Sequence, residues 1–224
     1  MQPYLFPYIG YFQAISSVDK FVIYDDVNYI KQGWINRNRI VVNNEAHFIT
    51  LELIGSSSFK KINEIQTGRN KNKIIKTIES YYKRAPFFEE IFELLKNILS
   101  NDENNLAKFL ANSLLAINLK LGIDTTILIS SEMQKNNQLK GQDKVIHICN
   151  LLNATTYINA IGGQELYSKK VFDQNGIELK FIKSNQIEYK QFNSPFISNL
   201  SIIDVMMNCG ISETSKLIKN YELI

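Results

Sequence analysis

Apolar residues in the first fifty positions change their spacing several times, and each spacing predicts a different element. Between residues 9 and 18 they recur at about the interval of a helix turn, as on one face of a short helix. Residues 21–24 (FVIY) form a β-branched and aromatic run that predicts a buried strand, and residues 1–3 are expected to form a strand stub. Two further strand-like runs, 39–42 and 47–53, flank NNEA at 43–46. Because asparagine tolerates left-handed backbone angles, these runs predict a β-hairpin over residues 39–53.

Helical spacing dominates residues 72–121, where three amphipathic stretches follow one another and Pro86 precedes the second. Strands then alternate with helices: strands at 125–129, 156–160 and 178–182, and helices at 142–152 and 164–173. Two short helices, 200–208 and 213–221, are expected on either side of Cys209 and Gly210. Such alternation favours a parallel sheet with helices on its faces. We therefore predict an α/β fold with a mostly parallel open sheet flanked by helices.

The length of 224 residues fits one domain, 1–224, that carries a β-hairpin at 39–53 and a helical insertion at 72–121. Apolar residues make up 45% of the chain and charged residues 21%, which argues against a disordered or disulfide-stapled protein. The net charge of +3 is too small for a dedicated nucleic-acid binder. No apolar run reaches the length of a membrane span, and no signal-peptide pattern opens the chain, so we expect a cytoplasmic protein.

Cys149 and Cys209 lie far apart in apolar surroundings and are expected to be buried free thiols. No pair of histidines or cysteines has the spacing of zinc ligands, and we expect no metal site. The sequence also lacks a P-loop, a nucleophile elbow and the Rossmann glycine fingerprint.

Polar residues gather where the predicted strands end, which is where open α/β sheets bind ligands. They are Asp25 and Asp26 after the first strand, Ser130 and Ser131 after the second, Gly162 and Gly163 after the third, and Tyr189 and Gln191 after the fourth. Paired glycines let backbone amides approach a phosphate, and serines can bind phosphate or hydroxyl groups. The alternative readings are a tight turn for the glycines and a helix N-cap for the serines.

Residues 25–39 (DDVNYIKQGWINRNR) hold the densest set of reactive groups. Carboxylates can deprotonate an attacking amine or hold Mg²⁺, cations such as Lys31 and Arg37 can neutralise phosphate or an oxyanion, and Trp34 can stack on a base or sugar. The alternative is an exposed, solvated loop. We favour a functional site because the only tryptophan and an arginine between two asparagines are costly choices for solvation alone.

Five segments together resemble the WbqC-like family: residues 2–12 (QPYLFPYIGYF), 25–31 (DDVNYIK), 34–38 (WINRN), 157–163 (YINAIGG) and 200–204 (LSIID). The resemblance spans nearly the whole chain. Members of this family are commonly encoded in bacterial gene clusters for O-antigen, the polysaccharide part of lipopolysaccharide, and for other surface polysaccharides. The resemblance implies a transferase that attaches an amino acid such as glycine, or another acyl group, to the amine of a nucleotide-linked amino sugar.

Residues 7–11 (PYIGY) are similar in placement to the His-x-Gly-His turn of nucleotidyltransferase-type, HUP-like folds, with tyrosines at both histidine positions. Enzymes on that scaffold join a carboxylate to an amine through an adenylate, which makes ATP a candidate cofactor. The cofactor is otherwise unknown. The acyl donor is equally open between a free amino acid with ATP, a charged tRNA and a thioester.

Under this hypothesis Asp25 or Asp26 is the general base, and Lys31 and Arg37 hold phosphate or the oxyanion. The expected substrate contacts are Gln2, Tyr8, Gly10, Tyr11, Tyr29, Trp34, Asn36, Asn38, Ser130, Ser131, Gly162, Gly163, Tyr189 and Gln191. Two alternatives stay open: a non-catalytic nucleotide-sugar binding or scaffold protein of a polysaccharide assembly complex, and a glycosyltransferase whose acids hold a metal. The sequence is also compatible with an oligomer.

Overall fold

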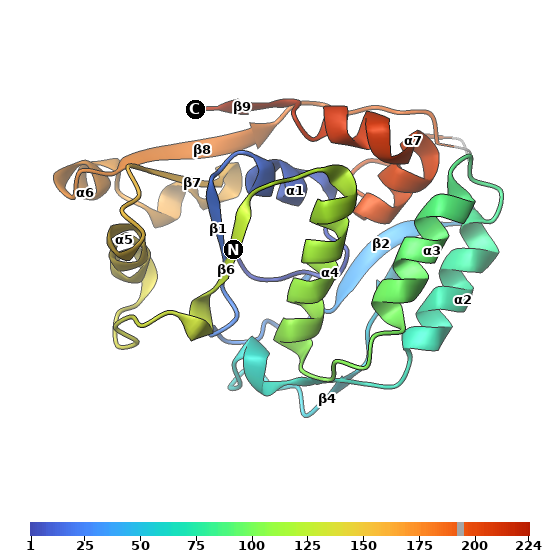
Figure 1. Ribbon diagram of the computed structural model, residues 1–224, viewed down its shortest axis with the longest axis horizontal. Helices are drawn as coiled ribbons and strands as arrows, with labels where there is room; N and C mark the ends of the chain where they lie inside the picture. The colour runs from blue at the N-terminus through green and yellow to red at the C-terminus, as the bar shows by residue number, and fades with distance from the viewer. Residues whose placement is uncertain (192–194) are drawn as a thin grey trace.

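The computed structural model describes residues 1–191 and 195–224 (Figure 1). Its strands are β1 (Lys20–Ile23), β2 (Arg37–Val42), β3 (Glu45–Thr50), β4 (Leu53–Ile54), β5 (Gln66–Thr67), β6 (Thr126–Ile129), β7 (Thr156–Ala160), β8 (Glu178–Ser184) and β9 (Tyr221–Leu223). Its α-helices are α1 (Ile9–Ser16), α2 (Lys71–Tyr82), α3 (Phe88–Leu99), α4 (Leu106–Leu121), α5 (Gly141–Leu151), α6 (Lys169–Gln174) and α7 (Ile202–Leu217). Short 3₁₀ turns are η1 (Ile62–Glu64), η2 (Ser130–Glu132) and η3 (Ile161–Leu166).

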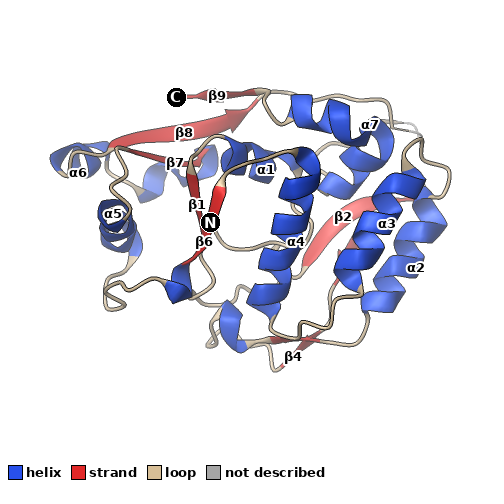
Figure 2. Cartoon of the chain, viewed as in Figure 1, coloured by secondary structure: helices blue, strands red, loops and turns tan. Residues whose placement is uncertain are grey.

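The α/β class is confirmed, but the strands do not form one continuous sheet (Figure 2). β1 pairs with β6 in parallel, and β7 pairs in parallel with β8, which pairs antiparallel with β9. The hairpin β2-β3 and the short pair β4-β5 are separate. Within the described residues β1 pairs with no strand but β6, and β7 with none but β8. The parallel strands that we expected in one sheet therefore fall into two groups.

The hairpin forms, with a tighter turn than the expected four residues. Asn43 and Asn44 alone connect β2 to β3, and their φ angles of 51° and 64° are those of a two-residue turn that follows the natural twist of the strands. The helices expected between residues 72 and 121 are present as α2, α3 and α4.

Two expected helices differ from the structure. The segment 164–173 is divided between η3 and α6, because Tyr167 between them is extended and packs its ring against Tyr157 and Phe172. The expected break at Gly210 is present, because Gly210 has non-helical angles (φ 71°, ψ 178°) that divide α7 into two parts. The second part ends at Leu217 instead of 221, since Tyr221 pairs with Ser184 on the open edge of β8. Among the described residues no helix is long and apolar enough to cross a membrane.

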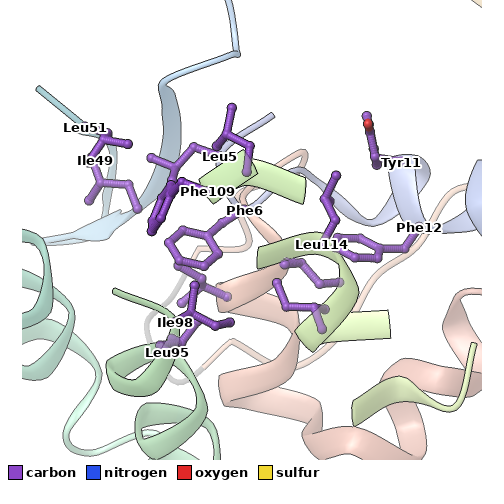
Figure 3. Packing of buried hydrophobic residues seen from close by; sticks show 14 of the residues in the cluster. Leu5, Phe6, Tyr11, Phe12, Ile49, Leu51, Leu95, Ile98, Phe109 and Leu114 are labelled. Atoms are coloured by element: carbon purple, nitrogen blue, oxygen red, sulfur yellow. The ribbon is translucent and has the colours of Figure 1, made fainter. Parts of the chain in front are cut away.

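The larger of the two buried apolar clusters joins the N-terminal segment, the hairpin and the helices α2, α3, α4 and α7. Figure 3 shows Phe6 and Leu5 of the N-terminal segment beside Phe109 of α4 and Ile98 of α3. The smaller cluster lies between α5, α6, β7 and β8. Helices α3 and α4 are thus packed onto the first residues of the chain, and these residues are irregular in backbone conformation.

That irregular segment is held by side chains from distant parts of the sequence. The amide of Asn38 donates to the carbonyl oxygens of Leu5 and Phe6, at 3.2 and 2.9 Å. The Ser201 hydroxyl donates to the Phe6 carbonyl at 2.7 Å, and the Ile202 N–H to that of Pro7 at 2.9 Å. Leu5 and Phe6 are fully buried, so these bonds replace the water that their carbonyls would otherwise require.

We expect Asn38→Asp to lower the free energy of unfolding by at least about 2 kcal/mol, because it replaces the donor to two buried carbonyls with an oxygen. Urea unfolding measures this change. The matched control is Asn28→Asp, since the exposed Asn28 also donates to a backbone carbonyl, that of Ser58. Equal stability of the two variants would contradict this role for Asn38.

Candidate functional site

Asp25 and the serine pair after β6 meet where the parallel strands β1 and β6 end. Asp25 is buried and accepts hydrogen bonds from the Ser131 backbone N–H (2.9 Å) and hydroxyl (2.6 Å). The Asn63 amide donates to the same carboxylate at 3.2 Å. The carboxylate of Asp25 therefore ties the η2 turn after β6 to η1, and the predicted proximity of the two strand ends is present in the structure.

Asp26 is the centre of an ion cluster with Lys135 and Lys144, which we call the Asp26 cluster. Its Oδ2 atom lies 3.0 Å from Lys135 Nζ and 3.2 Å from Lys144 Nζ, and the Ser130 hydroxyl donates to Oδ1 at 2.7 Å. Only 7% of the Asp26 side chain and 1% of the Lys135 side chain are exposed. Lys135 also donates to the Ser130 carbonyl. Burial raises the pKa of Asp26, but the donors Ser130, Lys135 and Lys144 outweigh burial, so the pKa is below its usual value and Asp26 is ionised at neutral pH.

A cavity of about 410 Å³ separates β1 from β7, next to the Asp26 cluster. At the carboxyl ends of the two strands it is lined by Tyr24 and Asn159. Lys144 Nζ lies 4.8 Å from the centre of the Tyr24 ring. Burial, and then the charge of Asp26, raise the pKa of Tyr24 to about 12.

Gly162 and Gly163 belong to η3, which follows β7 directly. A Cβ atom on Gly163 would lie 2.6 Å from Nδ2 of Asn159, whereas a Cβ atom on Gly162 would meet open space. Close packing against Asn159 thus explains the second glycine. Asn159, which packs against Gly163, and Tyr24, whose ring lies below Lys144 Nζ, both line this cavity.

Trp34 lies apart from that rim, on an exposed surface that it forms with Phe48, Arg37 and Arg39, here called the Trp34 surface. The rings of Trp34 and Phe48 are 5.9 Å apart, and 42% and 49% of these residues are exposed. The Arg37 guanidinium lies 4.3 Å from the Phe48 ring centre, and that of Arg39 5.7 Å from the Trp34 ring. Arg37 also donates to the carbonyls of Gln32 and Gly33. Lys31 is exposed in the same connection.

Several residues that we predicted as substrate contacts form hydrogen bonds within the protein that fix neighbouring backbone segments. The Asn36 amide donates to the Leu51 carbonyl at 2.8 Å and accepts from the Tyr29 hydroxyl at 2.8 Å. Asn38 binds the N-terminal segment, as described above. These three side chains therefore have an architectural role in this structure, and their contact with a substrate stays a prediction.

The predicted residues before and within α1 behave similarly. The hydroxyl of the buried Tyr11 donates to the Gln2 carbonyl at 2.8 Å, and burial raises the pKa of Tyr11 well above its usual value. Tyr8 is partly exposed, and its ring lies where a Cβ atom on Gly10 would be only 2.4 Å away. Glycine is thus required at position 10 for the Tyr8 ring to cover the start of α1.

Tyr189 and Gln191 meet at the buried carboxylate of Asp204, which the sequence analysis did not assign to the site. The Tyr189 hydroxyl and the Gln191 amide donate to Asp204 Oδ1 at 2.6 and 3.0 Å, and the Tyr82 hydroxyl donates to Oδ2 at 2.7 Å. Burial raises the pKa of Asp204, although the three donors act in the opposite direction. This network ties α2 and the segment before 192 to the first turn of α7.

The sequence analysis therefore did not predict four residues of these places as site residues: Lys135, Lys144, Phe48 and Asp204. Two of them carried a signal in the sequence: Lys144 stands four residues before Ile148, on the apolar side of its helix, and Asp204 interrupts the apolar run IIDVMM. Lys135 lies in an irregular segment whose spacing gives no such signal.

The guanidinium groups of Arg37 and Arg39 on the Trp34 surface suit a phosphate-bearing ligand, since guanidinium is a strong hydrogen-bond donor to phosphate oxygens. In residues 1–191 and 195–224 no three histidine, cysteine, aspartate or glutamate side chains gather as ligands for a metal ion. The Asp26 cluster combines a carboxylate acceptor with two cations, a combination that can accept a proton and stabilise developing negative charge.

Comparison with known proteins gives one consistent result. The model of the WbqC-like protein family matches residues 2–216. A protein of Mycobacterium tuberculosis, named only as the uncharacterized protein Rv1507c, is 31% identical over 209 residues, which are 91% of this chain and 90% of the relative. No solved structure gives a significant match. The chain that carries these candidate sites is therefore a member of the WbqC-like protein family.

Proposed function

We propose that the protein is a transferase that attaches an amino acid, or another acyl group, to the amine of a nucleotide-linked amino sugar during the assembly of a bacterial surface polysaccharide. The observation that carries this proposal is the Asp26 cluster, a buried carboxylate between two lysines where parallel strands end. Ligands bind at that end of open α/β sheets.

Amide formation requires an acceptor for the proton of the attacking amine and cations for the negative charge of the tetrahedral intermediate. Of the two acids, Asp26 is the better candidate for contact with the amine. Its partners Lys135 and Lys144 are cationic, and Lys144 adjoins Tyr24 at the cavity rim. Asp25 is bound by Ser131 and Asn63, and we assign it the role of positioning the η2 turn.

The Trp34 surface supports a nucleotide as the group attached to the sugar. Exposed aromatic faces stack on bases, and guanidinium groups pair with phosphates. Trp34 and Phe48 supply the faces, and Arg37 and Arg39 supply the charge. Glycine is the acyl group we would test first, with ATP, charged tRNA and thioesters as the forms of activation.

Mass spectrometry of amino-sugar nucleotides, incubated with the protein and each donor, tests the reaction. We expect a mass gain of one amino-acid residue, and at least a 100-fold lower turnover in Asp26→Asn, in line with the roughly 10²–10⁴-fold contribution of a positioned proton acceptor. Sugars that stay unchanged with every donor would contradict the proposal. Unchanged sugars that nevertheless bind would identify a non-catalytic nucleotide-sugar binding protein.

Asp26→Asn leaves two buried ammonium groups without their carboxylate, a change that costs about 3–5 kcal/mol in other buried pairs, so folding must be checked by urea unfolding. The double variant Asp26→Asn with Lys135→Met removes one of these charges and keeps the experiment interpretable. Asp173→Asn, an exposed acid in α6 that does not line the cavity, is the matched control and should retain full turnover.

Trp34→Ala tests the Trp34 surface separately. Because Trp34 lies outside both buried apolar clusters, the variant should fold normally, and its Kd for a nucleotide sugar should rise by about 5- to 100-fold through the loss of base stacking. Isothermal titration calorimetry measures both proteins. The control is Phe59→Ala, since Phe59 is 93% exposed. A Kd in Trp34→Ala equal to that of the control would exclude this surface from nucleotide binding.

A further inference from the structure

A phenylalanine is almost fully exposed at the tip of a tight turn between β4 and η1. The Lys60 N–H donates to the Ser57 carbonyl at 3.1 Å, so Ser58 and Phe59 are the two central residues of a β-turn. The Phe59 N–H also donates to the Ser57 hydroxyl, at 3.3 Å. Phe59 is 93% exposed, more than any other large apolar residue that the structure describes.

Hydrogen bonds to a second segment hold this turn in place. The Tyr29 N–H donates to the Lys60 carbonyl at 2.9 Å, and the Asn28 amide donates to the Ser58 carbonyl at 3.1 Å. Asn28 also pairs with Lys61 in an antiparallel bridge. The protein therefore presents the phenylalanine ring to solvent at a fixed position.

Two exposed isoleucines extend the apolar area around this ring. Ile30 is 54% exposed and directly follows the residue that bonds to Lys60, and Ile54 is 53% exposed at the end of β4. Lys60 Nζ lies 3.2 Å from where a Cβ atom on Gly55 would be, so the Lys60 side chain lies beside the residue that follows Ile54. Figure 1 draws β4 at the lower edge of the molecule. We call the following residues the Phe59 surface: Ile30, Lys31, Ile54, Phe59, Lys60 and Lys61.

All charged residues of the Phe59 surface are lysines. The segments 27–34 and 54–63 contain Lys31, Lys60 and Lys61 and no acidic residue, and their charge of +3 equals the net charge of the whole chain. Over the ranges 1–191 and 195–224, no ion pair joins these three ammonium groups to a carboxylate. The next acid along the chain, Glu64, accepts from the Lys61 backbone N–H at 2.7 Å. The surface thus combines exposed apolar side chains with positive charge.

We propose that the Phe59 surface docks the protein reversibly onto a bilayer that contains anionic phospholipids. Phe59 enters the boundary between headgroups and acyl chains, and the three ammonium groups lie among the headgroup phosphates. The isoleucines have no ring to stack on a base, and lysine lacks the bidentate geometry of arginine, so the composition favours lipid over nucleic acid. This inference does not depend on the proposed function, because binding to a bilayer requires neither a sugar nor an acyl donor.

Flotation with lipid vesicles tests the proposal on the full chain. We expect the protein to float with vesicles in which about one lipid in three is phosphatidylglycerol, and to stay in solution with pure phosphatidylcholine. About 0.5 M NaCl should weaken binding, since salt screens exposed charges. Phe59→Ser should lower the partition coefficient at least about tenfold through the lost burial of the ring. Lys60→Gln and Lys61→Gln should each lower it about fivefold.

Leu119→Ser and Lys76→Gln are the matched controls and should float like the original chain. Lys76 is exposed on α2, and Leu119 is 84% exposed on α4. The first residue of α4, Leu106, is bonded to Ile65 just after η1, and Leu119 lies about 20 Å farther along the helix axis. Phe59 lies outside both buried apolar clusters, so urea unfolding should show that Phe59→Ser folds normally.

A single tryptophan reports whether the turn enters the lipid. Trp34 is the only tryptophan of the chain, so the double variant Trp34→Phe with Phe59→Trp carries one indole, at the tip of the turn. Phospholipids with brominated acyl chains should quench its fluorescence, and its emission should shift to shorter wavelength. The double variant Trp34→Phe with Leu119→Trp should show neither change.

A chain that does not bind anionic vesicles, or that floats equally well after Phe59→Ser, would overturn the proposal. Binding of a single-stranded oligonucleotide that requires Phe59 and Lys60, without binding to vesicles, would identify a nucleic-acid surface and also overturn it. So would a dimer that Phe59→Ser dissociates and that does not bind vesicles, since the surface would then belong to a contact between two copies of the chain.

Discussion

The backbone of residues 5–7 is buried without belonging to a helix or a strand, and its hydrogen bonds join it to side chains and backbone groups from distant parts of the sequence. Asn38 and Ser201 supply the donors to Leu5 and Phe6. Phe6 has a φ angle of 42°, which a bulky residue adopts only when its surroundings impose it. Once this segment is fixed, its side chains form one wall of the core on which α3 and α4 pack, and the start of α1 is placed.

The placement of α1 and β1 in turn decides where the charged groups lie. β1 ends at Ile23, so Asp25 and Asp26 fall beyond the paired region, beside the turn that follows β6. The two acids then have different surroundings. Neutral donors bind Asp25, whereas two ammonium groups bind Asp26. A buried carboxylate with two cations remains stable only because each charge has a partner, and the same charges are the groups that acyl transfer requires.

The division of the parallel strands links the candidate site to the cavity. Tyr24, which adjoins Lys144, and Asn159, which packs against Gly163, line the cavity, and in the described residues the edges of β1 and β7 that face it pair with no strand.

The sequence alone was sufficient for the local elements and for the proximity of some groups. Alternation of strands and helices predicted the α/β class, two adjacent asparagines predicted the hairpin, and the strand ends predicted that Asp25 and Asp26 would lie near Ser130 and Ser131. These features depend on neighbouring residues or on the common direction of parallel strands, so they can be predicted from the spacing of residues along the chain.

Tertiary structure decided which side chains of this loop form hydrogen bonds to backbone carbonyls and which stay exposed to solvent. Asn36, Asn38 and Trp34 are neighbours in sequence, yet the two amides are buried against backbone carbonyls and the indole faces solvent beside Phe48. Tertiary structure also brought Lys135 to Asp26 and three donors to Asp204, and it left an open space between β1 and β7. Each of these contacts joins residues far apart in the chain, and their partners depend on how the elements pack, which local spacing does not encode.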